Sequence, residues 1–342
     1  MRLTKSALDK AFVVGTFMSE NATLLDHVIS GERRALARAI TLVESSNPQH
    51  RKEAVSLLDA LPARARPAIR IGLSGTPGVG KSTFIESMGM FLAQAGHKVA
   101  VLAVDPSSGR TGGSILGDKT RMPMLARHPN AYIRPSPSGG FLGGVARHTR
   151  DAIHLVEAAG FDIILIETVG VGQSETAVSR LSDLFVLLLA PGGGDELQGI
   201  KRGIMELADF VVVNKADGDL QMAAARAVAD HQSAMRLMKP RFHAWAPEVH
   251  KVSAISQNGI PELWLRIEEA IEKLERSGEF AQQRSAQNVS AFHDELAASI
   301  TAHFLNAPDY AAMMKILETK VATGDFHPAV AVYEALAQLG LT

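Results

Sequence analysis

The sequence predicts an α/β protein built on a doubly wound, mostly parallel sheet, with helical extensions at both ends. The first observation is a series of short apolar runs between residues 68 and 254, each bounded by glycine, aspartate or proline and separated by helical stretches. These runs are apolar throughout, which is typical of strands buried on both faces beneath helices. The second observation is that the flanking segments show the three- and four-residue apolar spacing of amphipathic helices.

Residues 1–66 are expected to form an amino-terminal helical segment. Apolar residues recur at intervals of three and four between residues 22 and 62, and breaks at Gly31 and at residues 45–48 divide them into two or three short helices. Pro62 and Pro67 end the segment. Residues 1–20 only faintly imitate a signal peptide, because Asp9 interrupts the basic region and no small-residue cleavage site follows, so we expect a cytoplasmic protein.

Residues 67–276 are expected to form the central domain. Its strands are predicted at residues 68–74, 99–105, 161–167, 184–189, 210–214 and 249–254, and a helix at 261–276. Residues 277–342 are predicted to be helical, with a last helix at 328–339 and an apolar stripe at Phe292, Leu296, Ile300 and Phe304. This stripe can cover the central domain or a second copy of the chain, and its spacing does not decide between them.

Composition excludes several classes of protein. A chain of 342 residues can bury a sizeable core without disulfides, and it has no cysteine for a disulfide, a thiolate metal site or a thiol nucleophile. The 35 lysines and arginines against 36 aspartates and glutamates leave a net charge of -1, which argues against a large nucleic-acid-binding face. The apolar runs are far shorter than the ~20 residues that span a bilayer, so an integral membrane protein is not expected.

Residues 75–83 read GTPGVGKST and fit the phosphate-binding pattern G-x-x-x-x-G-K-[ST], between a predicted strand and a predicted helix. Glycines let backbone N–H groups surround phosphate oxygens, and the helix directs its positive end at the same anion. We expect Lys81 to reach the β- and γ-phosphates and Ser82 to hold Mg²⁺. The expected phosphate-binding residues are Gly75, Thr76, Pro77, Gly78, Val79, Gly80, Lys81, Ser82 and Thr83.

Residues 214–217 read NKAD at the end of a predicted buried strand, where ligands of open α/β sheets bind. The Asp217 carboxylate can accept from both the ring N–H and the exocyclic amine of guanine, whereas adenine offers no such pair, so the motif favours GTP over ATP. Asn214 is expected to brace neighbouring loops, and the stem of Lys215 to cover one face of the base. A backbone N–H that meets the guanine oxygen is expected within Ser253, Ala254 and Ile255.

Acidic residues are expected around the metal. Residues 167–170 take the place of a D-x-x-G element, with Glu167 in the position of the aspartate and Gly170 able to meet the γ-phosphate. Glu167 can still hold Mg²⁺ through water. Asp105 ends another predicted strand and Asp118 follows a glycine-rich stretch, so both are metal candidates. Asp105 can instead cap a turn, and Asp118 can pair with a neighbouring cation at the surface.

Hydrolysis is expected to be slow. Small GTPases place a water-orienting glutamine directly after the glycine of this element, but here Val171 follows Gly170 and the first glutamine is Gln173. The glycine-rich loop at residues 191–201 can act as a further switch or can be a solvent loop that opens a helix. Its polar candidates are Asp195, Glu196, Gln198 and Lys201.

The segments GTPGVGKST, AVDPSS, GGSILGDKTRM, RPSPS, GGVA, ETVGVGQSE, GDELQGIK and NKAD, in this order, resemble the MeaB/ArgK/MMAA-type GTPases, chaperones of adenosylcobalamin-dependent methylmalonyl-CoA mutase. The resemblance covers residues 22–276 well, the tail only in general character, and residues 1–19 not at all. It implies a homodimer through the carboxyl-terminal helices, with GTP-gated cofactor delivery to the mutase and protection of that enzyme. It also implies that Asp105, Asp118 and Glu167 serve Mg²⁺ and the switches, and that Lys201 links the partner to hydrolysis.

Several alternatives stay open. The same motifs suit a switch for a different acyl-CoA mutase or another partner, with hydrolysis serving only as a timer. An ArgK-like kinase or transport ATPase would require ATP, against which NKAD argues. GTPases of nickel insertion carry His-rich or Cys-containing sites, which this sequence lacks. His148 and His154 are six residues apart and the other histidines are scattered, so adenosylcobalamin is expected only on the partner enzyme.

Overall fold

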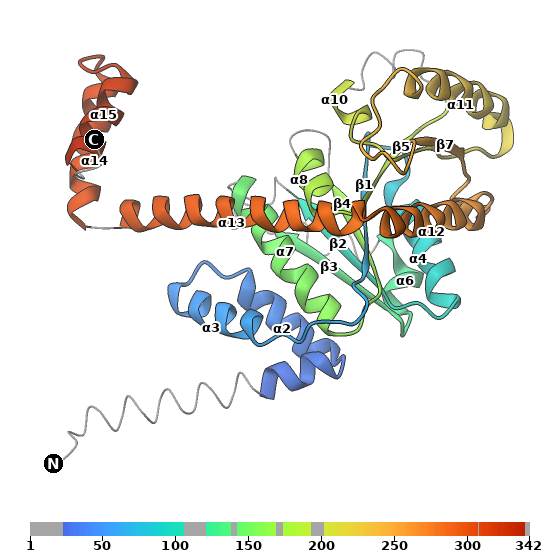
Figure 1. Ribbon diagram of the computed structural model, residues 1–342, viewed down its shortest axis with the longest axis horizontal. Helices are drawn as coiled ribbons and strands as arrows, with labels where there is room; N and C mark the ends of the chain where they lie inside the picture. Colours follow the sequence, from blue (N-terminus) through green and yellow to red (C-terminus); the bar gives the residue numbers. More distant parts are fainter. Residues whose placement is uncertain are drawn as a thin grey trace. The chain divides into compact units, whose positions relative to one another are not determined.

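The computed structural model describes residues 23–105, 121–137, 142–168, 174–192, 202–306 and 308–338. At its centre is a seven-stranded sheet in the order β3-β2-β4-β1-β5-β6-β7, in which all neighbouring strands are parallel. The strands are β1 (Ile69–Gly75), β2 (Val99–Asp105), β3 (Ala131–Pro137), β4 (Ile163–Thr168), β5 (Leu184–Leu189), β6 (Phe210–Val213) and β7 (Glu248–Lys251). The predicted doubly wound parallel sheet is confirmed (Figure 1).

Helices cover both faces of this sheet (Figure 1). One face packs against α2 (Arg33–Val43), α3 (Pro48–Asp59), α7 (Leu142–Ala158), α8 (Ser174–Leu181) and α11 (Gln221–Met235). The other face packs against α4 (Lys81–Gln94), α6 (Pro123–Arg127) and α12 (Ile260–Ser277). Successive residues of one strand enter different cores, as Val101 and Leu102 of β2 do, which explains why the runs are apolar throughout. A short helix, α10 (Arg202–Met205), precedes β6, and a 3₁₀ turn, η1 (Gly218–Leu220), precedes α11.

The strands β2 and β5 have the predicted bounds, and the others differ at their ends. The strand β3 is not among the predicted strands, because its segment AYIRPSP contains two prolines and an arginine. β3 lies at the edge of the sheet and pairs with β2 on one side only. A proline whose missing N–H would point to the open side therefore loses no hydrogen bond between strands. The last strand ends at Lys251 instead of Ala254, because the chain then turns and the N–H of Ser253 donates to the carbonyl of Asn258 at 2.9 Å.

The helices α2 and α3 share the core of the sheet. Leu36, Ile40 and Leu57 are at most 1% exposed and belong to the same apolar cluster as residues of β2, β4 and β5. Internal contacts divide the chain into two compact units, Met1–Gln287 and Asn288–Thr342, and the boundary lies within α13 (Glu279–Asn306). The division at residues 66 and 276 remains a prediction.

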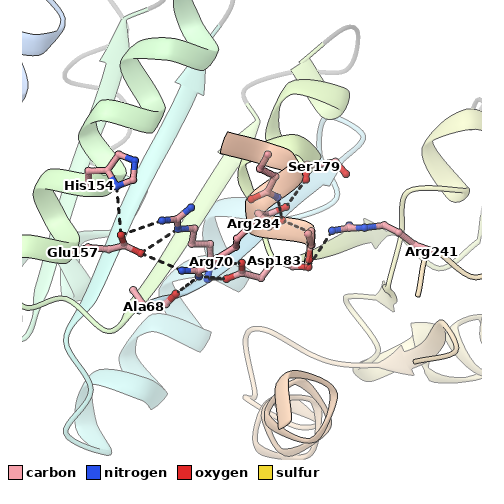
Figure 2. Close-up of polar contacts among 11 residues, drawn as sticks. Ala68, Arg70, His154, Glu157, Ser179, Asp183, Arg241 and Arg284 are labelled. Atoms are coloured by element: carbon pink, nitrogen blue, oxygen red, sulfur yellow. Dashed lines mark hydrogen bonds and ion pairs between the residues drawn. The ribbon is translucent and has the colours of Figure 1, made fainter. Parts of the chain in front are cut away.

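The first turns of α13 bind the amino ends of β1 and β5 (Figure 2). Arg284 donates from Nε and Nη2 to the two carboxylate oxygens of Asp183, at 2.8 and 2.7 Å, and from Nη2 to the carbonyl of Ala68 at 2.5 Å. The side chain of Asp183 is 0% exposed, and its Oδ2 also accepts from the backbone N–H of Arg70 at 2.8 Å. Arg70 in turn donates to both oxygens of Glu157 on α7, at 3.1 and 3.0 Å. A buried network of charge-assisted hydrogen bonds therefore joins α7, β1, β5 and α13.

The second unit contains the end of α13 together with α14 (Pro308–Ala322) and α15 (Pro328–Gln338). Its small core consists of Leu317, Ala331 and Ala335, with three partly buried apolar neighbours. Large apolar side chains of this unit remain exposed, including Phe292, Leu296 and Ile300 on α13. In the part of the chain that the structure describes, no helix has the length and apolar character to cross a membrane.

Candidate nucleotide-binding site

The predicted phosphate-binding loop connects the end of β1 to the start of α4. β1 ends at Gly75, and α4 begins at Lys81 after Gly80, whose φ of 90° lies in the left-handed region. The ammonium of Lys81 lies inside the loop, where Nζ donates to the carbonyl of Gly75 at 2.7 Å. The loop thus holds a cation beside the amino end of a helix, an arrangement that suits an anionic ligand.

Two glycines of this loop are required by close approaches. A Cβ on Gly75 would lie 2.4 Å from the carbonyl oxygen of Leu188, and a Cβ on Gly80 would lie 2.8 Å from Nδ2 of Asn214. The loop therefore packs directly against β5 and against the NKAD segment, which leaves no room for a side chain at either position.

The NKAD segment holds the phosphate-binding loop at two points. Asn214 is 1% exposed, and its Nδ2 donates to the carbonyl of Val79 at 3.0 Å while its Oδ1 accepts from the N–H of Ala254 at 3.1 Å. Lys215 has a backbone φ of 59°, which is uncommon for a residue other than glycine. Its Nζ donates to the carbonyl of Gly78 at 2.7 Å. Asn214 thus connects three loops through its side-chain amide.

The carboxylate of Asp217 is oriented by the loop after β7. Oγ of Ser253 donates to Oδ1 of Asp217 at 2.7 Å and accepts from the N–H of Ser256 at 3.2 Å. The side chain of Ile255, in the same loop, is 77% exposed. Ser253 contacts only Oδ1 of Asp217, and Oδ2 can accept a hydrogen bond from another donor.

Negative charge lies close to Lys81. Glu167 at the end of β4 is 5% exposed, and Glu175 in the first turn of α8 is 1% exposed. Burial lowers the pKa of Lys81, and the carboxylates of Glu167 and Glu175 oppose this by favouring the charged ammonium. Sequence reasoning missed Glu175, because neither its spacing nor its motif position indicates that α8 directs it toward the loop.

The donor chemistry at this edge fits a magnesium ion that arrives with a nucleotide. Among the described residues, no three histidine or carboxylate side chains gather into a complete metal site. Mg²⁺ keeps several waters and takes phosphate oxygens, so one or two protein oxygens are sufficient. The hydroxyl of Ser82 in the first turn of α4 and the carboxylate of Glu167 are oxygens of the required kind.

A family model described as "Methylmalonyl Co-A mutase-associated GTPase MeaB" matches residues 36–309. The chain belongs to the MeaB family of GTPases. The family that the motifs predicted is therefore confirmed, and so is the prediction that the chain is a GTPase.

Relatives share this MeaB-family sequence over most of its length. The Probable GTPase Rv1496 of Mycobacterium tuberculosis is 51% identical over 315 residues, which are 92% of this chain and 94% of the relative. The mitochondrial Methylmalonic aciduria type A homolog of Mus musculus is 49% identical over 311 residues, or 88% of this chain and 75% of the relative. The crystal structure of a LAO/AO transport system kinase aligns with a TM-score of 0.73 and 36% identity, over 94% of this chain and 98% of that one.

The structure of this MeaB-family chain brings many of the predicted residues to the carboxyl edge of the sheet. These are Gly75, Thr76, Pro77, Gly78, Val79, Gly80, Lys81, Ser82, Thr83, Glu167, Asn214, Lys215, Asp217, Ser253, Ala254 and Ile255. Asp105 ends β2, next to the end of β4, but its side chain lies outside the described residues. Asp118, Gly170 and Lys201, and the candidates Asp195, Glu196 and Gln198, also lie outside them.

Proposed function

We propose that this GTPase is a chaperone of an adenosylcobalamin-dependent methylmalonyl-CoA mutase, gating delivery of the cofactor to that enzyme and protecting it. The observation that carries the proposal is the match of residues 36–309 to a family described as methylmalonyl-CoA mutase-associated. The mouse relative, named for methylmalonic aciduria, supports the same metabolic setting. Adenosylcobalamin would contact the partner enzyme and not this chain.

In this proposal the phosphate-binding loop holds the nucleotide. Its backbone N–H groups and Lys81 bind the β- and γ-phosphates, and Asp217, oriented by Ser253, accepts both guanine donors. Ser82, Asp105, Asp118 and Glu167 serve Mg²⁺, which neutralises charge on the phosphates when bound. Lys81 and Glu167 are thus proposed to act in catalysis. The bond between Ser253 and Asp217 supports the guanine assignment, because a fixed carboxylate discriminates against a base that cannot donate to it.

Slow turnover is part of the proposal. Val171 occupies the position where small GTPases carry a water-orienting glutamine, so the free protein would not position the attacking water efficiently. Lys201 would supply a partner-dependent charge within the third switch loop. The protein is further proposed to be a cytoplasmic homodimer joined through residues 277–342.

GTP turnover of the purified protein, measured alone and with a cobalamin-dependent methylmalonyl-CoA mutase, tests this proposal. We expect slow turnover that rises on addition of the mutase, and no rise in the Lys201→Ala variant. Lys52→Ala, an exposed lysine of α3, is the matched control and should respond as the wild type does. ATP should not be turned over.

Equal turnover of ATP would favour a kinase or transport ATPase instead. A response to an isobutyryl-type or other acyl-CoA mutase, with none to methylmalonyl-CoA mutase, would transfer the proposal to that partner. No response to any such mutase would overturn the chaperone assignment.

A further inference from the structure

A cavity of about 520 Å³ lies beside β7, at the edge of the sheet. The end of α11, the loop at residues 236–247 and the first three residues of β7 line it. Val249 belongs to the core on one face of the sheet. The ring of His250 packs against that of Phe210, which belongs to the other core, with 5.8 Å between the ring centroids. Because both residues line the cavity, it runs along the edge of the strand and not under one face.

Val249 of β7 faces this cavity with an unused ladder position, and the N–H of Lys251 follows it along the strand. The N–H of Glu248 donates to the carbonyl of Asp209 at 3.1 Å, and the N–H of Val252 donates to that of Val213 at 2.9 Å. In a parallel ladder the bonded residues alternate, so the N–H and C=O groups of Val249, which lines the cavity, point away from β6, and so does the N–H of Lys251. The carbonyl of Lys251 packs against Gly259, where an added Cβ would lie 2.5 Å from it. Within the described sheet no strand lies beyond β7.

The cavity has an apolar floor and rim. Met235 is 5% exposed, Met238 is partly buried, and Pro240, Ala246, Pro247 and Val249 complete the apolar lining. Leu237, between the two methionines, is 88% exposed. Flexible thioethers accommodate apolar side chains of varied shape, which suits a pocket for one residue of an extended chain.

Positive charge predominates in the segment that forms this cavity: Arg236 lines it, and Lys239 and Lys251 are sequence neighbours of lining residues. Residues 232–251 contain Arg236, Lys239, Arg241 and Lys251 but only one acidic residue, Glu248, in a chain whose net charge is -1. Arg241 is paired with Asp209, and Glu248 with Arg266. Arg236, Lys239 and Lys251 are exposed and form no ion pair with any residue that the structure describes. An acidic ligand would therefore find three available cations around an open strand edge.

We propose that β7 and its cavity bind an extended, acidic segment of another protein, which adds to the sheet as an eighth strand. Its backbone would bond to the N–H and C=O of Val249 and to the N–H of Lys251. An apolar side chain would enter between Met235 and Met238, and carboxylates would face the free cations. This inference does not depend on the identity of the partner proposed above.

The test follows hydrogen exchange of individual amides of the full chain by NMR, with the peptide acetyl-Glu-Leu-Asp-Leu-Glu-amide as probe. Exchange at Val249 and Lys251 should slow about tenfold or more at saturation, whereas Glu248, already bonded to Asp209, should change little. The peptide acetyl-Lys-Leu-Lys-Leu-Lys-amide should not bind.

Variants distinguish the contribution of backbone hydrogen bonds to peptide binding from the contribution of the cations. Lys251→Pro removes a donor that points away from β6 and should abolish binding, whereas Lys251→Ala removes only the cation and should weaken it moderately. Arg236→Glu with Lys239→Glu should weaken binding about tenfold or more, while Arg226→Glu, elsewhere on α11, should not. GTP turnover confirms that each variant is folded.

Absence of slowing at Val249 and Lys251 with the acidic peptide would overturn the proposal, as would equal binding of the lysine peptide. A peptide that binds without slowing either amide would make the cavity a ligand pocket and not a docking edge. Undiminished binding to Lys251→Pro would exclude strand addition.

Discussion

At the scale of single residues, Glu157 illustrates how partners determine the charge of a buried carboxylate. Burial alone would raise its pKa, but His154, the two donors of Arg70 and the nearby Arg284 together lower the pKa to about 2. Because the folded-state pKa lies below the unfolded value of 4.5, the unfolded chain binds more protons between these values. The stability from Glu157 is therefore complete above about pH 4.5 and is lost as pH falls toward about 2.

We expect Glu157→Gln to lower the free energy of unfolding by about 3 kcal/mol at pH 7. The variant loses the interactions that lower the pKa of the Glu157 carboxylate, and the buried guanidinium of Arg70 loses its negatively charged partner. Urea denaturation between pH 7 and pH 3 checks this, and the gap from wild type should narrow below about pH 4.5. The same change at Glu272, exposed and paired with Arg276 at 3.1 Å, should cost under about 0.5 kcal/mol. Equal losses, or a gap that does not change with pH, would contradict this account.

At the scale of elements, the phosphate-binding loop and the NKAD segment form one assembly. Gly80 has a left-handed backbone and faces Asn214, which is itself held by Val79 and Ala254. A side chain at residue 80 must therefore displace a bonded amide that also supports the loop after β7. We therefore expect nucleotide affinity to depend on a contact between segments more than 130 residues apart, since Asn214 and Val79 are separated by 135 positions.

Gly80→Ala should weaken GDP binding about tenfold or more, since the added Cβ would lie 2.8 Å from Nδ2 of Asn214 and the residue would keep a strained φ. Calorimetric titration with GDP measures the effect. Gly96→Ala is the control, because Gly96 also has a left-handed φ, of 97°, but no heavy atom within 4 Å of the added Cβ. It should cost about 1 kcal/mol of stability and leave GDP binding unchanged. Identical GDP affinity in both variants would disprove the steric argument.

The sequence predicts those elements that depend on residues close together in the chain. The central strands are apolar on both faces, and the phosphate-binding pattern is contiguous, so both are recognisable from residue order. The edge strand β3 is not, because Pro135, Pro137 and Arg134 are tolerated only where one side of the strand is open. Arg70, Asp183 and Arg284 are separated by about a hundred positions each, and Glu175 reaches the site only through α8, so no spacing reveals these contacts.

At the scale of the whole molecule, the exposed apolar residues of the second unit bear on assembly. Phe292, Leu296 and Ile300 of α13 are 62%, 45% and 47% exposed at intervals of four residues. A stripe of this kind on one helix is typical of a surface that another chain covers. The proposed homodimer through residues 277–342 would bury it.

The triple variant Phe292→Ser, Leu296→Ser, Ile300→Ser should therefore sediment at the monomer mass of 36.5 kDa, whereas the wild type should sediment at twice that mass. Analytical ultracentrifugation at several concentrations makes the comparison. Leu265→Ser, which removes a 63% exposed leucine from α12, serves as the control and should stay dimeric. A wild type that is monomeric at every concentration would exclude the dimer.

The contacts of α13 also determine where a shortened form of the protein can end without losing part of its first unit. Gln283 and Gln287 donate to the carbonyl of Ser182, Arg284 binds Asp183, and Phe280 is buried in the core under α12. An expression fragment that stops at residue 276 would lose all of these and would leave the fully buried carboxylate of Asp183 without its arginine. A fragment that ends after residue 287 would keep every one of them, so the stop codon belongs one third of the way along a helix and not in the loop before it.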